Sequence, residues 1–197
     1  DDLRHYSLRF PLHHEAVLRR ESRRHQIDPA WVAAQTRAES AFMPRARSHA
    51  NARGLMQLLP STAERTARKL GLRWDGAESL YRPELNLELG IAHLRHELDD
   101  HGGIAYQAIA AYNAGPAPVM RWNRDRPGFD PDFWIETVTY KETREYVARV
   151  LAFSVIYDWR LEGSAVPVSE RLLGRTVPAS ARRPFTCPTS PGPGTPP

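Results

Sequence analysis

The spacing of apolar and polar residues predicts helices along nearly the whole of this chain. Apolar side chains recur every three to four positions up to about residue 160, and no strand-like alternation continues beyond about four residues. The sequence therefore predicts an all-α fold. The expected helices cover residues 11–25, 28–40, 60 to Gly71, 85 to Gly102, 104–113 and 119–123, with a short helix from Pro131 and a long one over 140–160.

The helical pattern ends near residue 163. Residues 178–197 contain seven prolines and few aliphatic side chains. Such a segment buries too little apolar surface to offset the entropy lost on ordering. We therefore expect a lead-in over residues 1–10, one helical domain over residues 11–162, and an extended or disordered Pro-rich tail over residues 163–197.

Composition narrows the class of protein further. A hydrophobic content of 41% and five tryptophans in 197 residues indicate a globular core. No apolar run approaches the roughly 18 residues that a membrane span needs, and no signal peptide is recognisable. The net charge of +4 fits a polyanionic partner, but it also fits an ordinary solvated surface. The single cysteine, Cys187, can form no internal disulfide.

A glutamate lies at the end of an apolar predicted helix. Asp28 and Pro29 begin this helix as N-cap and first helical residue, and Glu39 falls near its end. Apolar neighbours and the negative end of the helix dipole would both raise the pKa of Glu39, as a general acid requires. An amphipathic helix that ends in a solvated glutamate is the alternative interpretation. The stripe at helical spacing comprises Val32, Gln35 and Glu39, and includes Phe42 if the helical turn continues that far.

Three further segments contain residues that helix formation alone does not require. Gly54-Leu55-Met56-Gln57 groups a glycine, a thioether and an amide, which suits a groove floor or, alternatively, a tight turn with a core-filling side chain. Ala111–Gly115 offers a phenol and an amide, or simply ends a helix. Glu142, in the segment 140–147, suits either a binding site or a solvated first helical turn.

Three histidines suggest a metal site at first sight. His93 and His96 share one face of the predicted helix, and His101 follows near its end. Charged residues between and after them indicate a solvated face instead, and no zinc-protease pattern is present. We therefore expect no metal. The charged neighbours are Arg95, Glu97, Asp99 and Asp100.

Taken in order, the glutamate and the three segments resemble the lytic transglycosylase domain of the soluble, Slt-type peptidoglycan transglycosylases. The matching motifs are Glu39-Ser40, Gly54–Gln57, Ala111–Gly115 and Glu142–Val147, within about three quarters of the chain. The resemblance implies a goose-type lysozyme-like helical domain with a saccharide groove. It also implies a bacterial periplasmic or cell-envelope location. Because such relatives carry a large helical region before this domain, residues 1–10 are expected to be the end of one.

The same resemblance implies roles for single residues. Glu39 would be the catalytic acid, and Glu142 would lie in the groove near the reacting ring. Three positions depart from the family pattern, namely Leu59 in place of a frequent methionine, and Thr139 and Glu145 in place of proline and glycine. The substrate-binding set implied by the resemblance comprises Ser48, Met56, Gln57, Tyr112, Asn113, Glu142 and Tyr146.

One carboxyl group suffices for the family's reaction. Ordinary retaining glycosidases need a second carboxylate as nucleophile, but in the reaction that the resemblance implies the substrate would supply the nucleophile. Glu39 would protonate the leaving oxygen between N-acetylmuramic acid and N-acetylglucosamine, then accept the proton of the muramoyl C6 hydroxyl. The product is a 1,6-anhydro sugar, made without water, metal or organic cofactor.

Peptidoglycan glycan strands are therefore the expected partner, and the sequence leaves the oligomeric state open. Three alternatives remain. They are a hydrolytic goose-type lysozyme, a non-catalytic glycan-binding module and a basic DNA-binding protein. No helix with clustered base-reading side chains supports the last of these, so no nucleic-acid partner is expected.

Overall fold

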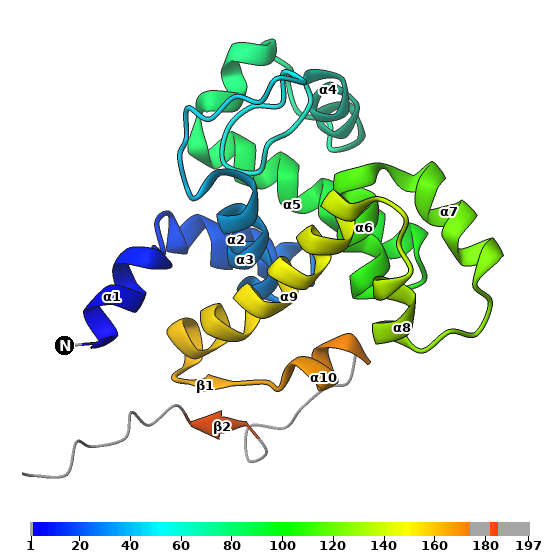
Figure 1. Ribbon diagram of the computed structural model, residues 1–197. Helices are drawn as coiled ribbons and strands as arrows, with labels where there is room; N and C mark the ends of the chain where they lie inside the picture. The colour runs from blue at the N-terminus through cyan, green and yellow to red at the C-terminus, as the bar shows by residue number, and fades with distance from the viewer. Residues whose placement is uncertain (1, 174–181, 185–197) are drawn as a thin grey trace, which may run out of the picture.

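The computed structural model describes residues 2–173 and 182–184, and these form a helical assembly with a single pair of very short strands (Figure 1). The predicted all-α class is confirmed. The elements are α1 (Asp2–Arg9), α2 (Glu15–Arg24), α3 (Pro29–Ser40), α4 (Pro60–Lys69), η1 (Ala77–Tyr81), α5 (Pro83–Asp100), α6 (Ala105–Ala114), α7 (Pro116–Asp125), α8 (Pro131–Glu136), α9 (Lys141–Glu162), β1 (Ser164–Ala165), α10 (Val168–Leu172) and β2 (Arg183–Pro184).

Helices α3 and α9 form the centre of the molecule, and they pack together more extensively than any other pair of elements. Helix α3 begins as predicted, because the Asp28 carboxylate accepts a hydrogen bond from Ala30 N at 2.8 Å and Pro29 follows the cap. Ala33 and Ala34 have no exposed surface, and neither have Val147 and Val150 of α9. Small side chains on α3 thus allow a close helix pair around which the main core is built.

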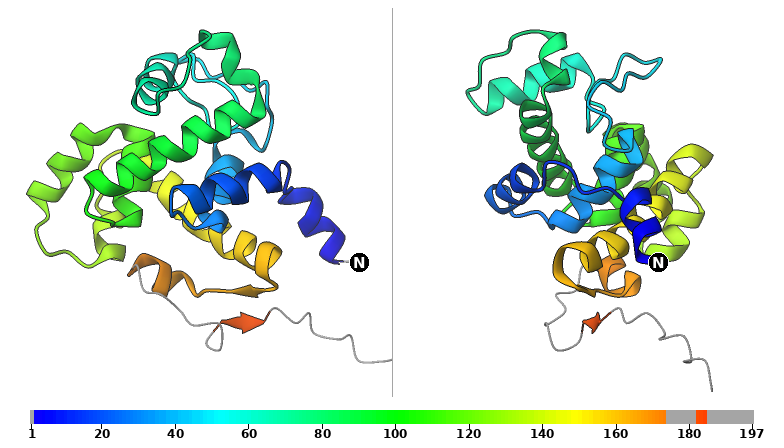
Figure 2. Two further views of the ribbon diagram at one scale, coloured as in Figure 1. Left: turned by 180° about the vertical axis from the view of Figure 1, so that it is seen from behind. Right: turned by 90° about the vertical axis from the view of Figure 1, so that its left-hand side faces the viewer.

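A second, smaller core lies under the long connection between α3 and α4. Helix α4 packs on α5, and buried residues of the connection, α4, η1 and α5 form this cluster. In Figures 1 and 2 these elements form a lobe beside the central helix pair. The lobe positions the connection 41–59 over the end of α3. The cluster comprises Leu58, Ala63, Ala67, Leu80 and Leu89.

The two ends of the chain differ from the expected boundaries. Helix α1 occupies the expected lead-in, and α2 is shorter than the helix expected over residues 11–25. Within the expected tail, β1 pairs antiparallel with β2, and α10 lies between them in the chain. Residues 174–181 and 185–197 of the tail, including Cys187, lie outside the described residues.

A buried carboxylate explains why residues 164–173 are folded against α9. Asp158 accepts a hydrogen bond from Val166 N at 2.6 Å and contacts Arg171 at 3.0 Å. Such contacts leave no trace in helical periodicity, so the pattern could not reveal them. Among the described residues, no helix has the length and apolar character needed to cross a membrane.

Candidate active site

Glu39 lies on the buried stripe that the sequence predicted. Val32 and Gln35 have no exposed surface and Phe42 is almost fully buried, whereas Glu39 itself is partly buried. The helix stops there because Ala41 and Phe42 both adopt left-handed backbone conformations, with φ of 52° and 63°. Burial raises the pKa of Glu39 to about 7. These surroundings favour the general-acid interpretation of Glu39 over that of a solvated glutamate.

Helix α9 supplies the charged and polar neighbours of Glu39. The buried Tyr146 hydroxyl donates a hydrogen bond to Glu39 Oε1, which lowers the pKa of Glu39, as the positive charge of Arg149 also does. The negative charge of Glu142 raises it. Burial and the charge of Glu39 raise the pKa of Tyr146 well above its usual value, so this phenol remains a donor.

The connection after α3, residues 41–59, forms a loop that is hydrogen-bonded to α3, the helix that carries Glu39. Ser40 Oγ donates hydrogen bonds to Leu55 O at 2.7 Å and to Thr36 O at 3.3 Å. Gly54 has φ of 78°, and a Cβ there would lie 2.3 Å from Leu80 O. Glycine is therefore required at this position for both conformation and space.

Asn86, which the sequence analysis missed, organises the same loop from α5. Its side chain is buried, and Nδ2 donates to Arg53 O and Leu80 O, both at 2.9 Å. Its Oδ1 accepts a hydrogen bond from Met56 N at 2.8 Å. One asparagine in the first turn of a helix carries no such signal in a single sequence, because its loop partners, Arg53 and Met56, are 33 and 30 residues away in the chain.

Met56 and Gln57 lie differently although they are neighbours. Met56 has no exposed surface, and a Cβ on Gly90 would lie 2.4 Å from its sulfur. The Met56 side chain therefore fills the core, and no exposed atom of it can make the expected substrate contact. Gln57 is partly exposed, and its Nε2 donates to Ala46 O at 3.1 Å and Gly54 O at 2.9 Å.

Tyr112 of α6 is hydrogen-bonded to the loop. Its hydroxyl donates a hydrogen bond to Met56 O at 2.8 Å. Burial is the largest cause of the raised pKa of Tyr112, followed by the charges of Glu39 and Glu97. Tyr112 is thus a neutral phenol whose pKa responds to the charge of Glu39.

The remaining predicted residues have structural partners. Asn113 Oδ1 accepts a hydrogen bond from Thr143 Oγ1 at 2.7 Å, which joins α6 to α9. Ser48 Oγ accepts one from Ala52 N at 3.0 Å within the loop. Both side chains are partly exposed. The structure therefore groups Glu39 with Tyr112, Tyr146 and Glu142 and places Ser48 and Gln57 in the loop fastened beside them.

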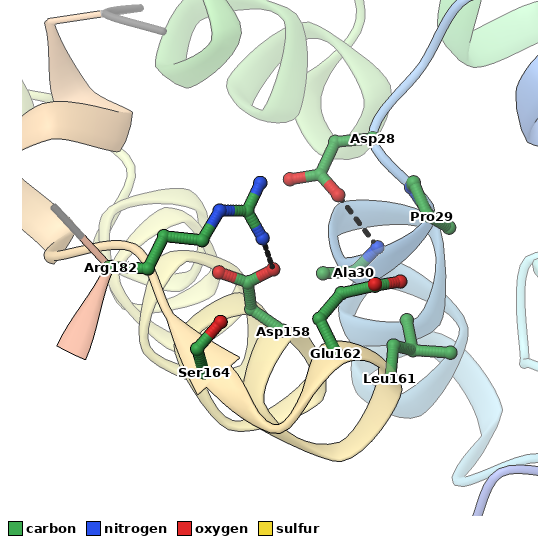
Figure 3. Close-up of a pocket in the computed structure, with 8 residues that line it drawn as sticks. All are labelled: Asp28, Pro29, Ala30, Asp158, Leu161, Glu162, Ser164 and Arg182. Atoms are coloured by element: carbon green, nitrogen blue, oxygen red, sulfur yellow. Dashed lines mark hydrogen bonds and ion pairs between the residues drawn. The ribbon is translucent and has the colours of Figure 1, made fainter. Parts of the chain in front are cut away.

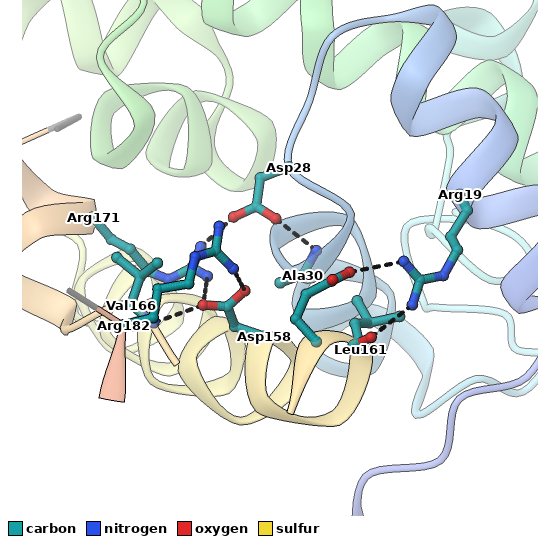
Figure 4. Close-up of polar contacts among 9 residues, drawn as sticks. Arg19, Asp28, Ala30, Asp158, Leu161, Val166, Arg171 and Arg182 are labelled. Atoms are coloured by element: carbon teal, nitrogen blue, oxygen red, sulfur yellow. Dashed lines mark hydrogen bonds and ion pairs between the residues drawn. The ribbon is translucent and has the colours of Figure 1, made fainter. Parts of the chain in front are cut away.

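A separate pocket lies at the opposite ends of α3 and α9 (Figure 3). It has a volume of about 420 Å³ and three carboxylates in its wall, Asp28, Asp158 and Glu162. Each carboxylate is already paired with an arginine: Glu162 with Arg19, and Asp28 and Asp158 with Arg171, as Figure 4 shows for the latter two. The described residues contain no group of three or more His, Cys, Asp or Glu side chains suited to a metal ion. The Glu39 cluster is thus the better candidate for chemistry.

Comparison with known proteins agrees with this geometry. The Transglycosylase SLT domain family matches residues 16–135, more than half of the chain. This chain belongs to that family. A second family model, the Soluble lytic transglycosylase helical domain, matches residues 137–165 of the chain. The resemblance inferred from the four motifs is therefore confirmed.

Curated relatives match most of this chain. It is 35% identical over 155 residues to the Soluble lytic murein transglycosylase of Salmonella typhimurium, covering 78% of this chain and 24% of that protein. The Escherichia coli K12 protein of the same name is 31% identical over 173 residues, which cover 87% of this chain and 27% of that protein. The chain thus spans about a quarter of the length of these curated relatives.

Solved structures match equally well. An inactive Glu-to-Gln mutant of lytic transglycosylase Slt from Pseudomonas aeruginosa has a TM-score of 0.79 and 42% identity, covering 82% of this chain and 26% of that one. A complex of the 70-kDa soluble lytic transglycosylase with bulgecin A has a TM-score of 0.78 and 31% identity, covering 80% and 26%.

Proposed function

We propose that this SLT domain is the catalytic part of a peptidoglycan lytic transglycosylase, with Glu39 as its acid and base. The observation that carries the proposal is a partly buried carboxyl with a pKa raised to about 7, bonded to a neutral phenol. Such a group holds its proton near neutral pH and can donate it to a leaving oxygen. The Pseudomonas relative, inactive after a Glu-to-Gln change, supports a mechanism that depends on one carboxyl.

In the proposed reaction Glu39 acts twice. It first protonates the glycosidic oxygen between N-acetylmuramic acid and N-acetylglucosamine, and the C1–O bond breaks. The ionised Glu39 then accepts the proton of the muramoyl C6 hydroxyl as O6 bonds to C1. Every atom is accounted for without water, and the product has a 1,6-anhydro end. Tyr146 supports the ionised state because its hydroxyl already donates to Glu39.

We further propose that the glycan strand lies along the surface that joins Ser48, Gln57, Tyr112 and Glu142. These side chains are partly or fully exposed and come from the loop, α6 and α9 around Glu39. Met56 and Tyr146, both buried, are assigned supporting roles below that surface. The protein would act in the bacterial cell envelope, and within it in the periplasm.

Mass spectrometry of digested sacculi tests the proposal. The wild-type domain is expected to release muropeptides with anhydro ends, and Glu39→Gln to lose about three orders of magnitude in rate, since the amide cannot donate the proton. Glu145→Gln is the matched control, because this exposed glutamate of α9 forms a surface ion pair with Lys141, with 3.7 Å between Oε1 and Nζ. Reducing ends instead of anhydro ends would indicate hydrolysis, and an active Glu39→Gln variant would exclude the assignment.

A further inference from the structure

One face of α5 is buried although its composition suggested a solvated surface. Only 15% of the His93 side chain is exposed, and Glu97 and His101 are both buried. Asp99 and Asp100 are exposed as expected. The expectation of a wholly solvated face is therefore wrong, because its inner side packs against α6.

His93 lies directly against Tyr112. The two ring centroids are 5.1 Å apart with an interplanar angle of 38°. At its other end the Tyr112 hydroxyl is fixed by the hydrogen bond to Met56 O. Tyr112 is thus held at two points, at its hydroxyl by the loop and on its ring by His93.

The imidazole of His93 is neutral. Burial lowers the pKa of His93 to about 4, and nearby cationic groups add to this effect. His93 and Glu97 therefore form no ion pair. The distance of 3.7 Å between His93 Nδ1 and Glu97 Oε1 is also too long for a hydrogen bond. What His93 offers Tyr112 is a flat, uncharged surface. The titratable and charged groups around it are Arg65, Lys69, His96, Glu97, Asp100 and Tyr112.

We propose that His93 is a positioning residue for Glu39, acting through the ring of Tyr112. The inference rests on the proposed function of Glu39 as the acid. A flat side chain at position 93 holds the ring of Tyr112, whose hydroxyl is bonded to Met56 O in the loop. The neighbouring Leu55 O of that loop accepts the hydrogen bond of Ser40, the residue next to Glu39. Without the flat side chain the Tyr112 ring gains rotational freedom, the loop beside Glu39 loosens, and the Glu39 carboxyl becomes more hydrated and holds its proton less well at neutral pH.

The test compares two substitutions of similar bulk that differ in shape. His93→Leu fills the space without a flat ring, whereas His93→Phe keeps one. We expect His93→Leu to lower kcat about ten-fold with little change in KM, since a small misplacement near the reacting groups costs this much or more. His93→Phe should stay within about two-fold of wild type. His96→Leu is the matched control, because exposed His96 lies on the same helix as His93 and contacts Lys69 of α4 and Asp100 of α5 instead of Tyr112.

A second measurement needs no substrate. Titration of the Glu39 side chain by carbon-13 NMR should give a lower pKa in His93→Leu than in the wild type, His93→Phe and His96→Leu. Equal pKa values in all four proteins would overturn the inference, as would equal kcat losses in the Leu and Phe variants. A wild-type domain without lytic activity would instead refute the proposed function, while the NMR comparison still decides the role of His93.

Discussion

At the scale of single residues, the acidity of Glu39 results from opposing effects. Burial raises its pKa most strongly, the Tyr146 hydrogen bond and Arg149 lower it, and Glu142 raises it again. The folded-state pKa of about 7 lies above the ordinary value of 4.5. The protonation of Glu39 therefore stabilises the fold. This contribution is fully present below pH 4.5 and is lost as the pH rises through about 7. The raised pKa that lets Glu39 act as an acid at neutral pH therefore lowers the stability of the fold at higher pH.

Glu39→Gln should reveal that cost as a pH-dependent gain in stability. At pH values near 4.5 the variant and the wild type should unfold with similar free energies, since residue 39 is largely neutral in both. At pH 8.5 the variant should be more stable by ~2–3 kcal/mol, because ionised Glu39 remains partly buried. Urea unfolding at both pH values measures the difference, with Glu145→Gln as control. A constant difference across pH would contradict the raised pKa.

At the scale of elements, local patterns predicted α3 well but not what supports the loop beside it. The cap at Asp28 and the buried stripe ending at Glu39 depend on residues within a few turns, so periodicity could place them. Asn86 bonds to the loop across about thirty residues, as the 2.8 Å contact with Met56 N shows. His93 looked solvated for the same reason, since the ring of Tyr112 that covers it belongs to another helix.

Gly90→Ala should disturb the site through α5. A Cβ at Gly90 would lie 2.4 Å from the Met56 sulfur and 2.8 Å from Met56 Cβ, so the Met56 backbone must move. Because Met56 O accepts the Tyr112 hydrogen bond, we expect both a stability loss of about 1–3 kcal/mol and a lower kcat. Urea unfolding and turnover measure the two effects.

A double-mutant cycle with Met56→Ala provides the control for Gly90→Ala. The shorter side chain removes the clash with the sulfur, so the double variant should lose less stability than the sum of the two single losses. Strict additivity would show that the two positions do not act through this contact.

At the scale of the whole molecule, the central helix pair has two functionally different ends. Glu39 and Tyr146 meet at one end, and Asp28 and Asp158 are bridged by Arg171 at the other. Helix rise places Asp28 about 16 Å from Glu39 along α3. The segment after α9 therefore fastens the pair from the side away from the candidate chemistry, as Figure 4 shows for the charged contacts.

Arg171→Met should lower the free energy of unfolding without changing the acidity of Glu39. The Arg171 side chain is 10% exposed and Asp158 only 4%, so removing the arginine leaves a buried carboxylate with fewer partners. We expect a loss of about 2–4 kcal/mol in urea unfolding, with the alkaline limb of the rate–pH profile unchanged because the surroundings of Glu39 stay intact. Arg124→Met is the control, since its ion pair with Asp125 is exposed and should be worth less than about 1 kcal/mol. A shifted limb in Arg171→Met would show that the far end of the helix pair also sets the acidity of Glu39.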